Sequence, residues 1–147
     1  MSDVQDSIDT DDTASVTGLA GTSAVGSVTI SANITTYTVT VATGTNSYGT
    51  GNKFYIDGSV SPTLTLTEGN TYRFDQSDSS NSTHPLRFST TANGTHGGGS
   101  EYTTGVTTNG TPGSSGAYTQ ITVASGAPTL YYYCTNHSGM GGQANTP

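Results

Sequence analysis

Apolar residues alternate with polar residues over most of the chain, and this pattern constrains the fold more than any other feature of the sequence. Because successive side chains of a β-strand point to opposite faces, the alternation indicates strands with one buried face. We therefore expect about eight or nine short strands. Their apolar positions are Val28 and Ile30, Tyr37, Val39 and Val41, Phe54 and Ile56, Leu64 and Leu66, Tyr72 and Phe74, Leu86 and Phe88, Tyr102 and Val106, Ile121 and Val123, and Leu130 and Tyr132.

Runs of Gly, Asn, Asp, Ser and Pro interrupt the alternation and are typical of turns and loops. Strands this short, joined at this spacing, predict an all-β sandwich or barrel of antiparallel type. The interruptions lie at 44–51, Asp57-Gly58, Ser61-Pro62, 68–70, 76–82, 91–100 and 109–116.

The composition agrees with strands and opposes helices. Only 30% of residues are hydrophobic and 9% are charged, while Gly occupies 20 positions. A low apolar content is also typical of disorder. Disorder is the weaker interpretation here, because the nine Tyr and three Phe residues fall within the alternating runs rather than being scattered.

Negative charge is concentrated at the N-terminus. The formal net charge is −7, and five of the ten acidic residues lie in the first dozen positions, while the rest of the chain is close to neutral. Binding to nucleic acid needs clustered Lys and Arg, which this chain lacks. No apolar run approaches the length that spans a membrane. We therefore expect neither nucleic acid nor a membrane as a partner.

The first 25 residues differ from the remainder in composition. They are acidic and rich in Gly, Ser and Ala, so we expect residues 1–25 to form a flexible or partner-ordered arm, followed by one domain at 26–147. The start of the chain has neither a positive segment nor an apolar segment, so we expect no secretory signal there. The spaced apolar residues that would contact a partner are Val4, Ile8, Val16 and Leu19.

Two candidate metal ligands are predicted to face the same interior. In the strand at 130–134, Cys134 shares a face with Leu130, and in the segment at 84–88, His84 shares a face with Phe88. Taken singly, a buried Cys is most often a small core residue, and a His is most often a surface residue or a hydrogen-bonded polar group. The shared orientation of both side chains favours a site.

The loop after Cys134 adds His137 and Met140, in the pattern Cys-x2-His-x2-Met. A Gly-rich turn can return all three side chains to one point. A thiolate, two imidazoles and a thioether suit copper in both oxidation states, with Cys and the two His residues as a trigonal set and Met as a weak axial ligand. The expected metal ligands are therefore His84, Cys134, His137 and Met140, with copper as the ion; zinc or an empty site are the alternatives.

At these residues the chain resembles the cupredoxins, the blue-copper domains of the plastocyanin and amicyanin type. The stretch Pro62–Phe74 is similar to the strand pair that precedes the first ligand in that family, and the resemblance covers roughly residues 36–142. It implies a cupredoxin-like Greek-key β-sandwich with a type 1 copper site. A soluble blue-copper protein of this kind transfers electrons, in which case a removed export signal would imply a periplasmic location.

The segments His84–Tyr102 and Leu130–Gly142 also resemble cupredoxin-like domains in structural proteins of marine bacteriophages, particularly cyanophages. That resemblance implies a virion structural protein, associated with the capsid as a decoration protein or with the tail, and bound to other virion proteins through its N-terminal arm. We expect this function in preference to free electron transfer. Self-association into a homo-oligomer is left open.

We expect no enzymatic activity. A trinuclear copper cluster needs more His than the three in this chain, a binuclear copper site needs a second Cys, and no Ser, His and acid grouping stands out. His96 lies outside the expected ligand set. It is either a residue that supports the site or a solvated loop residue, and we expect the latter.

Overall fold

The computed structural model describes residues 33–147. Within this range the chain is almost entirely β-structure, as predicted. The expected arm at 1–25, with Val4, Ile8, Val16 and Leu19, and the expected strand at Val28 and Ile30 lie outside the described residues. The strands are β1 (Ile34–Asn46), β2 (Gly49–Ile56), β3 (Ser59–Val60), β4 (Leu64–Thr65), β5 (Thr71–Asp75), β6 (Leu86–Ser89), β7 (Glu101–Tyr102), β8 (Val106–Asn109), β9 (Tyr118–Thr122), β10 (Leu130–Cys134) and β11 (Gly142–Asn145).

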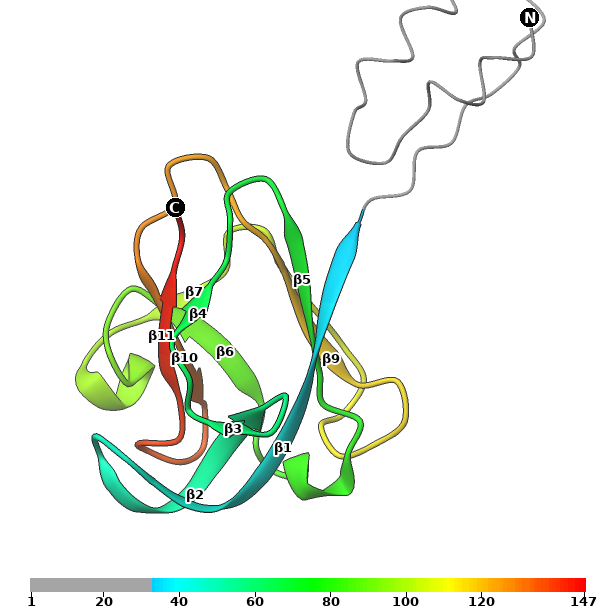
Figure 1. The fold of residues 1–147 in the computed structure, drawn as a ribbon, viewed down its shortest axis with the longest axis vertical. Coiled ribbons are helices and arrows are strands. Elements are labelled where there is room, and N and C mark those ends of the chain that lie inside the picture. The colour runs from blue at the N-terminus through cyan, green and yellow to red at the C-terminus, as the bar shows by residue number, and fades with distance from the viewer. Residues whose placement is uncertain (1–32) are drawn as a thin grey trace, which may run out of the picture. The chain divides into compact units, whose positions relative to one another are not determined.

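The strands form two sheets that pack as a β-sandwich, which confirms the predicted fold class (Figure 1). One sheet has six strands in the order β3-β2-β1-β5-β9-β8, and the other has five in the order β4-β11-β10-β6-β7. The sheets are mixed rather than purely antiparallel, because β1 pairs in parallel with β5 and β4 pairs in parallel with β11. Alternation along a single strand carries no information about the direction of its neighbour, so the sequence could not predict these pairings.

The core lies between the two sheets and consists of the apolar positions that alternate in the sequence. Val39, Phe54 and Leu86 are completely buried. Phe74 of β5 and Phe88 of β6 meet edge to face across the sandwich, with ring centroids 5.4 Å apart. Edge-to-face contacts are a favoured geometry for aromatic pairs, so this contact helps to fix how the sheets stack.

The first hairpin is longer than predicted. The Gly-rich stretch at 44–51 was expected to be a loop, but β1 continues to Asn46 and β2 begins at Gly49. Gly44 lies within the paired region, and a Cβ at Gly44 would lie 2.5 Å from the hydroxyl oxygen of Tyr55. Glycine here allows the Tyr55 ring to cross the partner strand, where its hydroxyl donates to the Thr43 carbonyl.

Pairing between β6 and β10 brings the predicted site together. These strands are antiparallel, with Cys134 opposite Leu86 and Tyr132 opposite Phe88. His84 precedes β6 by two residues, and His137 follows β10 by three. Both histidines therefore emerge at the same end of the sandwich as the Cys134 side chain.

Candidate metal centre

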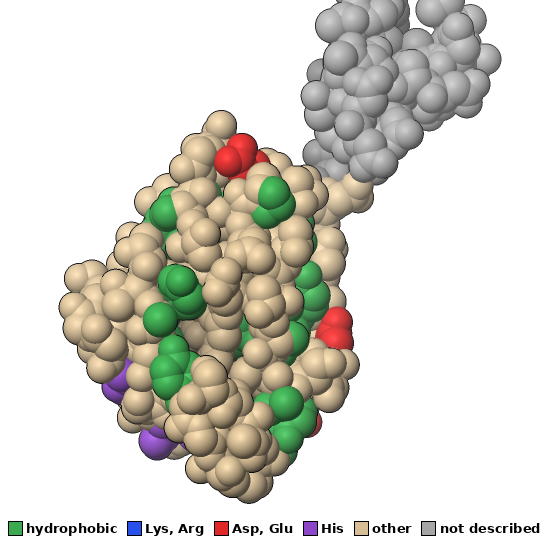
Figure 2. All heavy atoms as spheres, turned by 60° about the vertical axis from the view of Figure 1, so that its left-hand side comes forward, with side chains coloured by type: hydrophobic (Ala, Val, Ile, Leu, Met, Phe, Trp, Pro, Cys, Tyr) green, Lys and Arg blue, Asp and Glu red, His purple; other side chains and the backbone are tan. Residues whose placement is uncertain are grey.

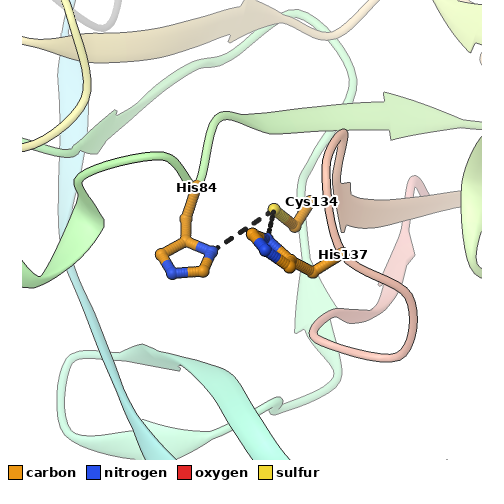
Figure 3. A group of neighbouring side chains, drawn as sticks. All are labelled: His84, Cys134 and His137. Atoms are coloured by element: carbon orange, nitrogen blue, oxygen red, sulfur yellow. Dashed lines mark hydrogen bonds between the residues drawn. The ribbon is translucent and has the colours of Figure 1, made fainter.

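His84, Cys134 and His137 form a compact group in which the ligand atoms all lie within 4.8 Å of one another. The Nδ1 atoms of both imidazoles face the Cys134 sulfur, each 3.6 Å from Sγ (Figure 3). The two rings lie with their centroids 4.6 Å apart. Cys134 and His84 are buried, while His137 is exposed. This group could bind a metal ion and leaves one edge of the site open to solvent.

The two sulfur–nitrogen distances are compatible with a shared ion as well as with hydrogen bonds. The Cys134 thiol can donate to one imidazole and accept from the Nδ1–H of the other, so both contacts can also form without an ion. Metal bonds of about 2.3 Å to sulfur and about 2.0 Å to nitrogen place ligand atoms roughly 3.5–3.8 Å apart when they subtend about 110–120° at the metal. The observed 3.6 Å lies in that range.

A buried polar network holds the segment around His84. The Gln76 side chain donates from Nε2 to the His84 carbonyl and accepts at Oε1 from the Leu86 N–H. Gln76 also donates to Asn81 Oδ1, and Asn81 donates to the Val39 carbonyl in the other sheet. Both side chains are almost completely buried, so every lost bond would leave a polar group unsatisfied. The sequence indicated only a polar loop here.

Two hydrogen bonds join the His84 segment to the loop at 135–141, which we call the ligand loop. Asn136 donates from Nδ2 to the Thr83 carbonyl, and the Thr135 N–H donates to the Pro85 carbonyl. Thr83 adopts a left-handed conformation with φ of 68°, which is unusual for a β-branched residue. These two hydrogen bonds hold the His84 segment and the loop that carries His137 at a fixed separation, and they need no bound ion to form.

Gly139 is the point at which the rest of the domain holds the ligand loop. Its carbonyl accepts from Lys53 Nζ at 2.7 Å and from Asn46 Nδ2 at 2.9 Å. Its N–H donates to Oδ1 of Asn93, whose Nδ2 donates to Ser138. Burial lowers the pKa of Lys53, which is 3% exposed. No pattern in the sequence predicted that the single Lys would be buried beside the site.

Met140, the predicted axial ligand, is buried in the hydrophobic core and 1% exposed. Its carbonyl accepts from the Phe54 N–H and from the Ser61 hydroxyl. The residue therefore has a fixed backbone on the loop that follows His137. Ligation by its sulfur stays a prediction.

The surroundings of Cys134 act on its thiol in opposite directions. Burial raises the pKa of Cys134, and hydrogen bonds from the backbone N–H groups of Asn136 and His137 offset part of that effect by favouring the thiolate. Burial also lowers the pKa of His84, and the neighbouring His137 lowers it further. A neutral imidazole is the form that binds metals, so the His84 environment favours ligation.

His96 is exposed in a loop, as expected, but its ring also contacts the strand that carries Cys134, which the expectation did not include. Its Nε2 donates to the Cys134 carbonyl at 2.8 Å, and its ring meets the Tyr133 ring edge to face. Tyr133 alternates with Tyr132 and Cys134 along β10 and so lies on the face away from the core, yet it is only 1% exposed. The loop at 91–100 folds over that face and buries it.

Comparison with protein-family models, with curated protein sequences and with solved structures finds no significant match for this chain. Within residues 33–147, no helix has the length and hydropathy of a membrane span. Functional assignment therefore depends on the geometry of the site and on the sequence features described above.

Proposed function

We propose that this chain is a structural protein of a bacteriophage particle, built on a cupredoxin-like domain that holds one copper ion. The observation that supports the copper site most directly is the convergence of His84 Nδ1, His137 Nδ1 and Cys134 Sγ from separate segments. Two imidazoles and one thiolate form the trigonal donor set of blue-copper sites, and Met140 is the proposed axial ligand. A copper ion bound there would cycle between Cu(I) and Cu(II).

The surface near the exposed ligand favours a structural role over free electron transfer. Asn136, His137 and Ser138 are exposed, and the neighbours of His137 are polar. On the face drawn in Figure 2, hydrophobic side chains lie in separate patches, a few Asp or Glu side chains are visible, and no Lys or Arg is visible. A redox partner that docks at His137 would meet polar residues on both sides of that ligand in the chain, where an apolar anchor would favour docking. The soluble blue-copper carrier is the alternative function.

The copper site is tested by adding Cu(II) to the reduced, metal-free protein. We expect an intense visible band from thiolate-to-copper charge transfer, and its loss in Cys134→Ser. His96→Gln is the matched control: it replaces the one His outside the ligand set but keeps an N–H donor for the Cys134 carbonyl, so the band should persist. A folded protein that gives no band and retains no copper contradicts the copper proposal, and zinc retained without colour would identify the alternative ion.

The role in a particle is tested by co-sedimentation with phage particles that lack this protein. We expect the full-length chain to bind, deletion of residues 1–25 to abolish binding, and Cys134→Ser to bind normally. Equal binding by the truncated chain would refute the arm as a tether. Failure of the full-length chain to bind would refute the virion role and leave the electron carrier as the better account.

A further inference from the structure

A pocket of about 480 Å³ lies beside the candidate metal centre but does not include its ligands. Its walls come from the β1–β2 turn, from the segment around β3, and from β10 with the start of β11. We call it the Tyr48 pocket, after the aromatic residue in the β1–β2 turn. None of His84, Cys134 and His137 lines it. Its volume is typical of sites for small ligands.

The Tyr48 pocket has no charged side chain in its lining, and this narrows the class of ligand. Charged side chains are the strongest ligands for anions and for hard cations, and His and Cys bind transition metals, but none of these lines the pocket. Hydrophobic ligands require a mainly apolar lining, but Val60 is the single large aliphatic side chain here. What remains is an uncharged, polar ligand.

The lining offers hydrogen-bonding groups that the described part of the chain leaves unused. The hydroxyls of Ser47, Thr63 and Tyr131 make no hydrogen bond within residues 33–147. Each hydroxyl can both donate and accept. Gln143 adds an amide whose Nε2 donates to Asn145 and whose oxygen accepts no hydrogen bond from any other residue at 33–147. Groups of this kind match a ligand that is itself covered with hydroxyls.

The Tyr48 pocket also contains an exposed aromatic ring in addition to these polar groups. Tyr48 is 47% exposed and Val60 is 37% exposed, and they are two of the three large apolar residues exposed in residues 33–147. Both line the Tyr48 pocket. A tyrosine ring with one open face offers apolar contact area at low entropic cost, and the C–H face of a pyranose ring can stack on it.

From these features we infer that the Tyr48 pocket binds a neutral saccharide, with Tyr48 as the stacking platform and the hydroxyls of Thr63 and Tyr131 as hydrogen-bonding partners. This function is independent of the copper site and of the proposed virion role. Extended peptides are the less suitable occupant, because Val60 is the single aliphatic side chain that the lining offers to an apolar side chain of a peptide.

The test is a titration of the ¹⁵N-labelled full chain with maltotriose, cellotriose and chitotriose, followed by NMR. We expect saturable shifts of the amides of Ser47, Tyr48 and Gln143 with at least one saccharide. Tyr48→Ala should weaken binding at least tenfold. Thr63→Val removes one free hydroxyl and leaves the Tyr48 ring unchanged, and it should weaken saccharide binding about three- to tenfold. Ile34→Ala is the matched control, because Ile34 is the exposed apolar residue outside the pocket, and it should change nothing.

Tyr48 contacts the ligand loop, since its Cβ lies 3.0 Å from the position that a Cβ at Gly139 would take. Loss of binding in Tyr48→Ala with unchanged binding in Thr63→Val would therefore indicate a disturbed loop and contradict the inference. Loss in both Tyr48→Ala and Thr63→Val supports the pocket. No saturable shift with any of the three saccharides overturns the inference. So does binding that survives in both variants, or saturation at the same amides by a neutral peptide or an anionic saccharide instead.

Discussion

Lys53 is the single lysine of the chain, and it is buried next to the candidate metal centre. Burial of an ammonium group is unfavourable unless hydrogen bonds and opposite charge compensate it. The structure gives it the Gly139 carbonyl as an acceptor, and the only ion pair in residues 33–147 joins Arg87 to Glu101. Within residues 33–147, Lys53 is therefore buried without an acidic partner.

Two substitutions of Lys53 should distinguish the contribution of its packed side-chain volume to the free energy of unfolding from the contribution of its charge. Lys53→Met keeps most of the volume, and Asn46 still donates to the Gly139 carbonyl, so we expect the free energy of unfolding to stay equal or rise by up to about 1 kcal/mol. Lys53→Ala leaves a cavity and should cost about 2 kcal/mol or more. Urea denaturation of the metal-free protein measures both. Equal damage in the two variants would show that the ammonium bond to Gly139 is needed for stability.

Among the elements, the short 3₁₀ turn η3 (Gly94–Gly97) has the clearest link to the site. Asn93, at its start, holds the ligand loop at Ser138 and Gly139, and His96, within it, holds the Cys134 carbonyl. Gly94 allows this approach, because a Cβ there would lie 2.4 Å from the Tyr133 ring and its φ is +57°. The turn therefore covers β10 only if position 94 has no side chain.

Two glycine substitutions in this loop test that explanation. Gly94→Ala adds a clash with Tyr133 to the strain of a left-handed backbone, and we expect it to cost about 2–4 kcal/mol. Gly98→Ala also has a positive φ, of +88°, but meets nothing within 4 Å, so it should cost only about 1 kcal/mol. Denaturation measures the difference, and hydrogen exchange should show lost protection at 94–99 in the first variant alone. Equal costs would refute the packing role of Gly94.

On the scale of the whole molecule, buried tyrosines fill part of a core that is composed mainly of aliphatic residues in proteins of higher hydrophobic content. Tyr132 is 1% exposed, and its hydroxyl donates to the Pro62 carbonyl at 2.6 Å. Burial raises the pKa of Tyr132 well above its usual value of 10.0. The unfolded chain therefore ionises this residue first as the pH rises.

This linkage predicts loss of stability in alkali. The contribution of Tyr132 is fully present below pH 10, and it is lost as the pH rises above 10, at up to about 1.4 kcal/mol per pH unit. Tyr132→Phe removes the ionisable group and one hydrogen bond, so it should be less stable by about 1 kcal/mol at pH 7. We expect the two free energies of unfolding to converge and then cross between about pH 10 and 12. Parallel curves in urea denaturation would contradict the assignment.

Much of the fold could be predicted from local pattern alone. Alternation identified the strands around Phe54, Phe74, Phe88 and Leu130, because a strand with one buried face repeats every two residues whatever its neighbours are. It failed for Tyr133, which lies on the face that alternation assigns to solvent. The loop at 91–100, which is remote in sequence, covers that face. The alternation within a single strand cannot predict that another segment will bury its outer face.

The sequence by itself determined the all-β class and the identity of the group His84, Cys134 and His137, because side-chain parity and short loop spacing are local properties. Only the tertiary structure decided the parallel pairings, the burial of Lys53 and the role of His96. Each of these depends on contacts between segments far apart in the chain: Lys53 meets Gly139 across 86 positions and His96 meets Cys134 across 38. Such contacts follow from how two sheets stack and how loops fold over their ends, and neither is set by the periodicity of any single strand.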